Sequence, residues 1–491
     1  MMSSDGSDGA RAPDSPVRVN LISLGCPKNL VDSEMILGGL GSRGLVVTQE
    51  AEDADIIVVN TCGFVDSAKE ESINTILEAC ELKKDSETPK KVVVAGCLAQ
   101  RYGSELRREI PELDAIVGLG EYGDLADTLL ELAGGDRRPM HYQVSDPTKA
   151  CQAEVGRFRL TPSHYAYLRI SEGCDNPCTF CAIPAIRGRF RSKPISMILE
   201  EARELTASGA RELILISQDT TSYGVDLDGK FQLHRLLEEL AGVDGVEWIR
   251  VLYAYPAFTT DEMIEAIATI PQVVKYFDIP LQHISDRMLR RMGRRMSERK
   301  TRALLDRTRQ RIPGLFLRTT FIVGFPGETD EDFESLRDFI EDFRFERLGV
   351  FPFSREDNTP SASFPDQLPE ELIKERLETL MLTQQEVAFR HNRERRDEVV
   401  DVLIDSLEGD DSEVSGLVAR GRTYGEAPEI DPQVLLSAGT TSPPDSAAGL
   451  GASGGFRELP LLRASASVEP GQMVRARITG SRDYDVLATP L

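Results

Sequence analysis

The chain has 491 residues, enough for about three domains of ordinary size. It carries 57 Lys and Arg against 81 Asp and Glu, a net charge of −24, and 41% of its residues are hydrophobic. This composition excludes a disordered or fibrous chain. The acidity also disfavours a surface devoted to nucleic acid and favours a basic protein partner.

The sequence carries no membrane or export signal that we can identify. No apolar run approaches the roughly 20 residues that span a bilayer, and residues 1–16 lack the apolar core of a signal peptide. We therefore predict a disordered N-terminus over 1–16, a cytoplasmic location and no membrane partner. In that reducing compartment, the eight cysteines are expected to bind metal or do chemistry rather than form disulfides.

From residue 17 to 134, short β-rich runs alternate with longer amphipathic segments, which predicts an α/β domain with a parallel sheet. The predicted strands are Val17–Leu24, Ile56–Asn60, Val92–Ala95 and Ile116–Val117. The predicted helices are Leu30–Arg43, Asp66–Lys84 and Ala99–Glu109, and in the second of them the expected buried face is Ile73, Ile76, Leu77 and Cys80. A polar connector is predicted over 135–162.

A second and longer α/β alternation, over 163–396, predicts an open or partial parallel barrel of six strand–helix units. Its predicted strands are Ala166–Ser171, Leu213–Ser217, Trp248–Leu252, Tyr276–Ile279, Arg318–Val323 and Leu348–Phe351. The helical pattern of Pro369–Arg395 is expected to pack back on this barrel. The fold class is therefore α/β, with two parallel-sheet domains in succession.

The composition changes over 397–491, where short alternating runs predict a small all-β module. These runs are Val399–Ile404, Gly416–Ala419 and Met473–Thr479. A tract rich in Gly, Ser, Ala and Pro over 437–455 is expected to be a flexible insertion. From Arg395 onward the chain has nine basic and sixteen acidic residues, a net charge of −7.

Three cysteines lie together immediately after the first predicted strand of the second domain. Cys174, Cys178 and Cys181 have the spacing C-x3-C-x2-C. Three thiolates on one short loop can each bind one iron of a [4Fe-4S] cubane and leave the fourth iron open for a small molecule. A structural zinc requires four ligands, and no fourth Cys or His lies near this loop. The spacing therefore favours an iron–sulfur cluster over zinc.

A second group of cysteines is spread over the first domain. Cys26, Cys62 and Cys97 each follow a predicted strand within two or three residues, and each has a glycine beside it. Because the carboxyl ends of parallel strands meet at one edge of a sheet, three such loops can bring three thiolates together. The alternative is that these three cysteines are ordinary small buried residues. We expect Cys80 to be such a core residue. Cys151 is assigned no role.

Further motifs extend the pattern, and together they resemble one known family. They are Ser-Leu-Gly-Cys-Pro-Lys-Asn at 23–29, Asn-Thr-Cys-Gly-Phe at 60–64, Gly-Cys-Leu at 96–98, the Cys174 loop through Arg187 and Gly188, Asp-Ile-Pro-Leu-Gln-His at 278–283 and Val-Gly-Phe-Pro-Gly-Glu at 323–328. The sequence resembles the radical S-adenosylmethionine methylthiotransferases from about residue 17 to the end. Within the family it is most similar to the branch that modifies an aspartate of small-subunit ribosomal protein number twelve.

The resemblance implies two [4Fe-4S] clusters with different tasks. The Cys174, Cys178 and Cys181 cluster would bind S-adenosylmethionine and reduce it to a 5′-deoxyadenosyl radical, which removes hydrogen from the β-carbon of the aspartate. The auxiliary cluster on Cys26, Cys62 and Cys97 would carry the sulfur that is methylated and transferred. The implied partners are the ribosomal protein, possibly on the ribosome, and an electron donor such as flavodoxin or ferredoxin. The last module resembles a TRAM domain.

Four further residues are candidates for contact with S-adenosylmethionine. Phe180 lies between two cluster ligands, Gln218 and Asp219 end a predicted strand, and Gly324 belongs to a strand-to-helix turn. Ordinary packing, capping and turn formation are the alternatives for these positions. His283 is expected to be structural. The run of eight basic residues between Arg287 and Arg302 is interpreted as a solvated helix face, with contact to ribosomal RNA as the alternative.

Two other functions are the alternatives. A transfer RNA methylthiotransferase would use the same clusters on an anticodon-loop adenosine, but in that branch the first motif typically reads Gly-Cys-Gln-Met-Asn, and the TRAM-like module here is negatively charged. A non-catalytic electron carrier or cluster scaffold is disfavoured, because carriers usually ligate every iron.

Overall fold

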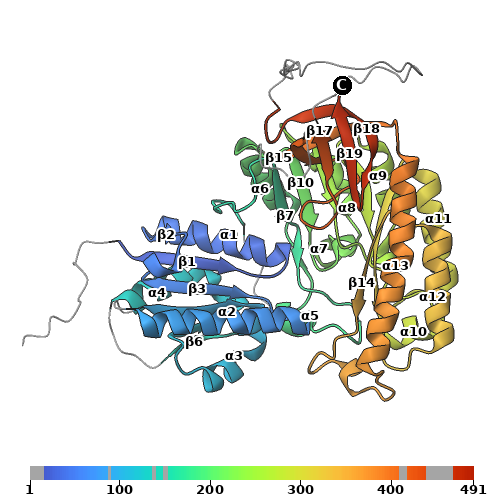
Figure 1. The fold of residues 1–491 in the computed structure, drawn as a ribbon. Coiled ribbons are helices and arrows are strands. Elements are labelled where there is room, and N and C mark those ends of the chain that lie inside the picture. The colour runs from blue at the N-terminus through green and yellow to red at the C-terminus, as the bar shows by residue number, and fades with distance from the viewer. Residues whose placement is uncertain (1–15, 87–89, 135–139, 148–152, 409–416, 438–467) are drawn as a thin grey trace, which may run out of the picture.

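The computed structural model describes residues 16–86, 90–134, 140–147, 153–408, 417–437 and 468–491. Two α/β bodies lie side by side, and a small β-barrel sits at one end of the second body (Figure 1). The predicted disordered segment, apart from Pro16, the predicted insertion, apart from Ser437, and Cys151 lie outside the described residues. None of the described helices has both the length and the apolar run that a bilayer span requires.

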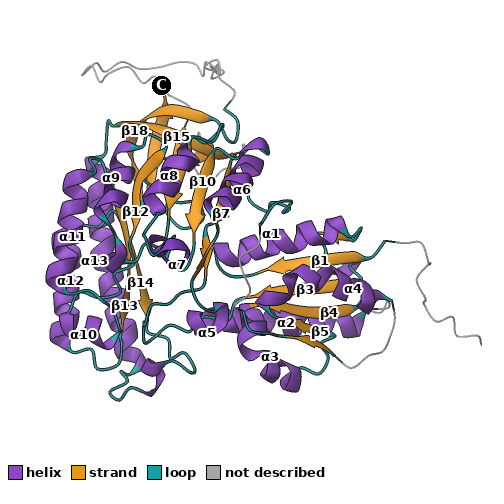
Figure 2. Cartoon of the chain, turned by 180° about the vertical axis from the view of Figure 1, so that it is seen from behind, coloured by secondary structure: helices purple, strands orange, loops and turns teal. Residues whose placement is uncertain are grey.

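The first body is a six-stranded, fully parallel sheet in the order β2-β1-β3-β4-β5-β6. Helices cover both of its faces, as crossover connections between parallel strands require (Figure 2). Its elements are β1 (Arg18–Ser23), α1 (Pro27–Ser42), β2 (Val46–Thr48), β3 (Ile56–Thr61), α2 (Asp66–Asp85), β4 (Lys91–Gly96), α3 (Cys97–Glu109), β5 (Ala115–Val117), α4 (Leu125–Ala133) and β6 (His141–Gln143).

The parallel sheet confirms the predicted fold class, with differences in detail. Strands β2 and β6, of three residues each, were not predicted. Strand β6 lies within the predicted connector but pairs with β5 in the sheet of the first body. The buried face predicted for α2 is partly wrong. Ile76 and Cys80 are buried, but Ile73 is 39% and Leu77 44% exposed, because the helix packs through Ser72, Ile76 and Ala79 instead.

The second body is an open, fully parallel sheet in the order β14-β13-β12-β11-β10-β7. The six strands confirm the predicted partial barrel. They are β7 (Tyr165–Arg169), β10 (Glu212–Ile216), β11 (Trp248–Val251), β12 (Val273–Asp278), β13 (Phe316–Val323) and β14 (Arg347–Pro352), and a short antiparallel pair, β8 (Ser171–Glu172) and β9 (Arg191–Ser192), lies apart.

Helices cover the outer face of this sheet, and several begin at side-chain caps in the sequence. Ser285, Ser297 and Thr329 each accept a hydrogen bond from the first helical turn that follows them. The helices of this body are α5 (Ile183–Arg187), which contacts α3 of the first body, α6 (Ile195–Ala207), α7 (Val225–Asp228), α8 (Leu233–Ala241), α9 (Asp261–Thr269), α10 (Asp286–Arg291), α11 (Glu298–Arg311), α12 (Asp330–Phe343) and α13 (Glu370–Glu394).

The inner face of the sheet is filled from two directions by other parts of the chain. Val31 of α1 and Ala427 of the C-terminal module belong to the same buried apolar cluster as Tyr167, Leu252 and Tyr276 of the central domain. The first body therefore approaches the concave side of the partial barrel, where its sheet is open. This arrangement places the loops of both parallel sheets next to each other.

The C-terminal module is a closed five-stranded barrel in the order β15-β16-β17-β19-β18. The strands are β15 (Val399–Leu407), β16 (Leu417–Arg422), β17 (Val434–Ser437), β18 (Met473–Arg482) and β19 (Asp485–Pro490). Buried charges attach it to the central domain. Arg422 donates to Glu212 at 2.6 Å, and Arg347 donates to Glu426 at 2.7 Å, with all four side chains at most 5% exposed.

Glu426 makes this attachment dependent on pH. Burial by itself would raise the pKa of Glu426, but Arg347 and Arg395 outweigh this effect and lower the pKa to about 2. A carboxylate with a lowered pKa stabilises the native state above its unfolded pKa, near 4.5, and this contribution is lost as the pH falls toward 2.

We expect Glu426→Gln to lower the free energy of unfolding at pH 7 by about 3 kcal/mol, because it removes the buried carboxylate that two buried guanidinium groups share, and only Arg395 keeps another carboxylate, that of Glu398. Chemical denaturation between pH 7 and pH 3 measures the effect, and the difference from the wild type should shrink below pH 4.5. Glu247→Gln, at the exposed pair with Arg211, is the control and should cost less than about 1 kcal/mol. A difference that is constant with pH would contradict the assignment.

Candidate functional site

The first cysteine triplet lies at the carboxyl edge of the N-terminal sheet. Cys26 precedes α1 directly after β1, Cys62 follows β3, and Cys97 begins α3 after β4. These three strands are neighbours in the sheet, so their loops meet. The loops are in direct contact: a Cβ added at Gly25 would lie 2.9 Å from the Cβ of Cys62, and one added at Gly63 would lie 2.7 Å from the carbonyl carbon of Cys97.

Polar groups from two domains surround Cys97. Its Sγ lies 3.3 Å from Nη2 of Arg187, which belongs to the central domain, and 3.8 Å from Oδ1 of Asn29. The Asn29 amide also donates to the carbonyl oxygens of Leu24, at 2.6 Å, and Thr61, at 3.2 Å, and so holds two of the cysteine loops together. The predicted auxiliary ligands are therefore brought together on a rigid edge.

The second triplet lies on the loop between β8 and α5, at the edge of the central sheet. The backbone N–H and the side-chain amide of Asn176 both donate to Sγ of Cys174 at 3.4 Å. A guanidinium N–H of Arg294 donates to Sγ of Cys178 at 3.6 Å. Donors directed at cysteine sulfur are typical of the surroundings of bound metal clusters.

Burial makes the thiols of Cys97, Cys174 and Cys181 hard to ionise. Burial, reinforced by the neighbouring cysteines, raises the pKa of Cys97 to about 12, although Arg187 opposes the shift. Burial likewise raises the pKa of Cys174 to about 11 and that of Cys181 to about 12. Thiols this hard to ionise become thiolates when a metal displaces their protons. The donor set of each triplet, three soft sulfurs on one edge, is compatible with an iron–sulfur cluster.

A short helix joins the two triplets. Helix α5 begins two residues after Cys181, and its residue Ile186 and the preceding Ala182 pack in one small apolar cluster with Cys97. Arg187, at the end of the same helix, then contacts the Cys97 sulfur. The two candidate cluster sites are therefore linked by a single turn and a half of helix.

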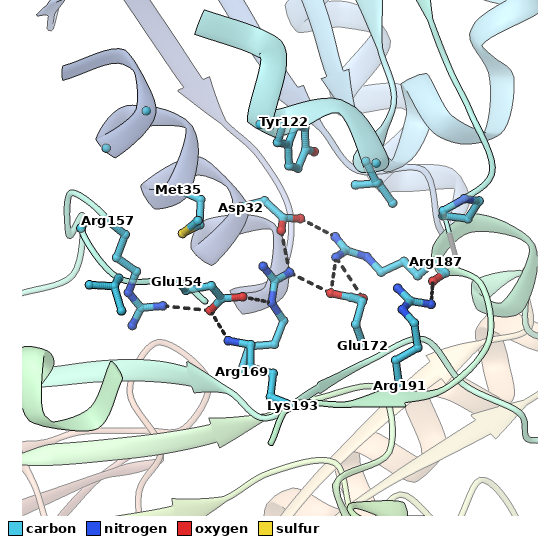
Figure 3. A pocket seen from close by; sticks show the side chains of 18 of the residues that line it. Asp32, Met35, Tyr122, Glu154, Arg157, Arg169, Glu172, Arg187, Arg191 and Lys193 are labelled. Carbon is cyan, nitrogen blue, oxygen red and sulfur yellow. Dashed lines mark hydrogen bonds and ion pairs between the residues drawn. The ribbon is translucent and has the colours of Figure 1, made fainter. Parts of the chain in front are cut away.

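Arg187 also belongs to a buried network of charges between the two domains (Figure 3). Asp32 of α1 accepts from Arg187 at 2.8 Å and from Arg169 of β7 at 2.6 Å. Both arginines also contact Glu172, and Arg169 contacts Glu154 at 2.6 Å. A cavity of about 420 Å³ lies beside this network, bordered by α1, the connector and the loop after α5. Arg187 thus borders both the cavity and Cys97.

Gln218 and Asp219 lie beside the Cys174 loop, as their position at a strand end predicted. Asp219 accepts from the Asn176 amide at 2.8 Å and caps the turn at 220–222 through the N–H of Ser222. Gln218 donates to Glu172 at 2.8 Å, while its buried Oε1 has no hydrogen-bond partner among the described residues. Asp219 therefore organises the loop of the cysteines, and Gln218 retains an acceptor for a ligand.

Phe180 and Gly324 meet at an aromatic cluster. The Phe180 ring lies edge-on to Phe325, with 6.5 Å between ring centroids, next to Met288 and Met292. Gly324 has a φ of +77°, and a Cβ there would lie 2.4 Å from a side-chain carbon of Ile373. Packing thus accounts for both residues, and their contact with S-adenosylmethionine stays a prediction.

His283 and the basic run have structural partners. His283 is fully buried, and its Nδ1 accepts from the backbone N–H groups of Ile284 and Ser285. Within the run, Arg291 donates to the Pro326 carbonyl at 3.1 Å, and Arg294 reaches the Cys178 sulfur. The run is therefore only partly a solvated face, because several of its guanidinium groups attach the loops around the second triplet.

Several site residues escaped assignment from the sequence. Asn29, Asn176, Arg187 and Arg294 all contact a cysteine sulfur of a triplet. Asn29, Asn176 and Arg187 belong to the motifs given above and Arg294 to the basic run, but nothing in a single sequence distinguishes an arginine that contacts sulfur from one on the surface. Within the described ranges, no group of three His, Cys, Asp or Glu side chains is placed to hold a metal ion, so the cluster ligands remain predictions.

Comparison with known families divides the chain into three parts. Residues 18–118 match the uncharacterized protein family UPF0004, residues 168–340 match the radical SAM superfamily, and residues 398–491 match the TRAM domain. These three regions correspond to the parallel sheet with the first triplet, the partial barrel with the second, and the closed barrel.

Curated relatives match over almost the whole chain. The "Ribosomal protein uS12 methylthiotransferase RimO" of Geotalea uraniireducens is 45% identical over 470 residues, which are 96% of this chain and 97% of that protein. The protein of the same name from Geobacter sulfurreducens is 45% identical over 471 residues, 96% of this chain and 98% of that protein.

Among solved structures, the radical S-adenosylmethionine methyltransferase TsrM from Kitasatospora setae, with cobalamin and a [4Fe-4S] cluster bound, aligns with a TM-score of 0.52. The alignment covers 71% of this chain and 74% of that chain at 15% identity, a likeness of fold. On the strength of the relatives that match it from end to end, the chain belongs to the radical SAM superfamily and, within it, to the RimO family of ribosomal protein uS12 methylthiotransferases.

Proposed function

We propose that this enzyme attaches a methylthio group to the β-carbon of an aspartate in ribosomal protein uS12, using S-adenosylmethionine and two [4Fe-4S] clusters. The observation that carries the proposal is the pair of cysteine triplets at the edges of two adjacent parallel sheets, joined through α5. The names of the relatives support the methylthiotransferase reaction and its protein substrate.

The residues of the chain take distinct tasks in this proposal. Cys174, Cys178 and Cys181 hold the cluster that binds S-adenosylmethionine, and Cys26, Cys62 and Cys97 hold the auxiliary cluster. When bound, these groups supply one-electron reduction of the sulfonium and delivery of sulfur. The N–H groups of Asn176, Arg187 and Arg294 that contact cysteine sulfur in both triplets support these tasks. Gln218, with its free buried acceptor, is the best supported contact to S-adenosylmethionine; Asp219, Phe180 and Gly324 are weaker candidates.

The partners follow from the same proposal. The substrate is a basic ribosomal protein, for which the net charge of −24 is favourable. A reduced flavodoxin or ferredoxin supplies the electrons, and the reaction takes place in the cytoplasm. The domains that we propose cover residues 17–134, to which the structure adds β6 of the same sheet, 163–396 and 397–491.

The test compares cells with and without the gene. Mass spectrometry of uS12 should detect, only in cells with the gene, one aspartate in which a methylthio group has replaced a hydrogen. Bulk transfer RNA from the same cells should be unchanged. A modified adenosine in transfer RNA with unmodified uS12 would support the alternative branch, and no modification of either would overturn the proposal.

A further inference from the structure

Lys28 is a buried cation without an anion. Its side chain belongs to the first turn of α1, and the residue is only 8% exposed. The ammonium nitrogen lies 3.0 Å from the centroid of the Tyr253 ring, and it makes no hydrogen bond or ion pair with any residue that the structure describes. Buried charges in proteins are normally paired, because desolvation is costly. Three N–H donors are thus held in place with only the face of an aromatic ring as partner.

The acidic side chains nearest to Lys28 are already engaged by other donors. Asp278 accepts from Arg318 at 2.8 Å and from the backbone N–H of Tyr253 at 2.9 Å. Glu172 accepts from the two arginines of the interdomain network and from a glutamine amide. The remaining neighbour that favours the charged form of Lys28 is the thiol of Cys26, which the proposed function commits to the auxiliary cluster. With these groups engaged, the charge of Lys28 is available for an anion that is not part of the chain.

The position of Lys28 relates it to the site of sulfur transfer. It follows Cys26, a predicted ligand of the auxiliary cluster, by two residues, and Gly25 and Cys26 are exposed. Tyr253 follows the end of β11 by two residues, with a φ of +62°, on the edge of the central sheet that also carries the Cys174 loop. Lys28 thus lies where the two candidate cluster edges face each other.

We infer that Lys28 binds the side-chain carboxylate of the substrate aspartate and so selects this residue over its neutral relatives. The carboxylate is attached directly to the carbon that is modified in the proposed function, on which this inference rests. An ion pair with Lys28 would hold that carbon in a fixed position relative to the auxiliary triplet. Tyr253 would hold the ammonium group in place from the opposite side.

A second carboxylate in the reaction is that of S-adenosylmethionine itself. We assign Lys28 to the substrate because it stands on the loop of the auxiliary triplet, whereas S-adenosylmethionine belongs to the cluster on the Cys174 loop, which lies on other elements. An experiment can separate the two carboxylates, because replacing the target aspartate in the peptide removes one of them and leaves the carboxylate of S-adenosylmethionine unchanged.

The experiment uses anaerobically reconstituted holoenzyme and peptides of uS12 that carry the target aspartate or an asparagine in its place. Lys28→Met should weaken binding of the aspartate peptide, measured by fluorescence anisotropy, by about 30-fold or more, because one side of a buried charge pair is removed. Binding of the asparagine peptide should change by less than about threefold, which is within the effect of one weak contact. The dissociation constant of S-adenosylmethionine should not change.

Two further variants complete the test. Lys28→Arg keeps the charge and should recover much of the preference for aspartate, and Lys230→Met removes an exposed lysine as the matched control. Equal weakening for both peptides would assign Lys28 a structural role, and a loss confined to S-adenosylmethionine would assign it to the cofactor; either result overturns the inference. If wild-type enzyme neither binds nor modifies the aspartate peptide, the proposed function fails instead, and the inference falls with it.

Discussion

Replacing any cysteine of the second triplet by alanine will abolish the cleavage of S-adenosylmethionine, whereas replacing any cysteine of the first triplet will leave cleavage intact and stop methylthiolation. The reason is that the two triplets lie on different loops of different sheets, so each can lose its cluster separately. The measurement is the formation of 5′-deoxyadenosine and of modified uS12 by anaerobically reconstituted variants. The variants expected to lose cleavage replace Cys174, Cys178 or Cys181. Those expected to keep cleavage but lose methylthiolation replace Cys26, Cys62 or Cys97.

Cys80 provides the matched control for this series. It lies on α2 and packs in the apolar cluster formed with β3, β4 and α3, and burial raises the pKa of its thiol. Cys80→Ala should keep both activities and about the full iron content, at a stability cost of about 1–2 kcal/mol for a small core cavity. Loss of 5′-deoxyadenosine in both sets of triplet variants would contradict the division of tasks.

Arg187→Met is expected to lower the free energy of unfolding by about 3–5 kcal/mol, the usual cost of breaking a buried ion pair on one side. The side chain is 4% exposed and contacts Asp32, Glu172 and the Cys97 sulfur, so its removal leaves two buried carboxylates with fewer partners. It also removes an N–H donor from a predicted cluster ligand. The reduction potential of the auxiliary cluster should therefore fall, because such donors stabilise the more negative, reduced state.

Anaerobic denaturation measures the first effect, and a potentiometric titration followed by electron paramagnetic resonance measures the second. Arg187→Lys keeps the charge but not the planar fork, and it should recover part of the stability. Arg211→Met, at an exposed ion pair, serves as the control and should cost less than about 1 kcal/mol. An unchanged potential in Arg187→Met would show that the contact with Cys97 does not influence the cluster.

The alternation of apolar runs was sufficient to predict both parallel sheets and the long helix α13. It failed where local pattern and packing disagree. The three-residue strands β2 and β6 are too short to have a recognisable period, and they form because a neighbouring strand offers them hydrogen bonds. The face of α2 was misassigned because the hydrophobic residues Ile73 and Leu77 point to solvent, and small residues make the closer contact with the sheet.

In the candidate site, too, the sequence predicted what depends on local pattern and did not predict what depends on contacts between distant residues. Cysteine spacing and the position of each cysteine after a strand are local properties, and they predicted the two triplets, because parallel strands necessarily end at a common edge. The partners of those cysteines come from far away in the chain: Arg187 meets Cys97 across 90 residues and Asp32 across 155.

What the sequence determined by itself was therefore the pair of parallel sheets and the position of the two cysteine triplets at their edges, since both follow from repeated local patterns. Only the tertiary structure decided which charges are paired. It joined the triplets through α5, placed Arg187 against sulfur and left Lys28 facing Tyr253 without an anion. The physical reason is that burial and pairing of a charge depend on what the opposing domain brings to it, and no local pattern records that.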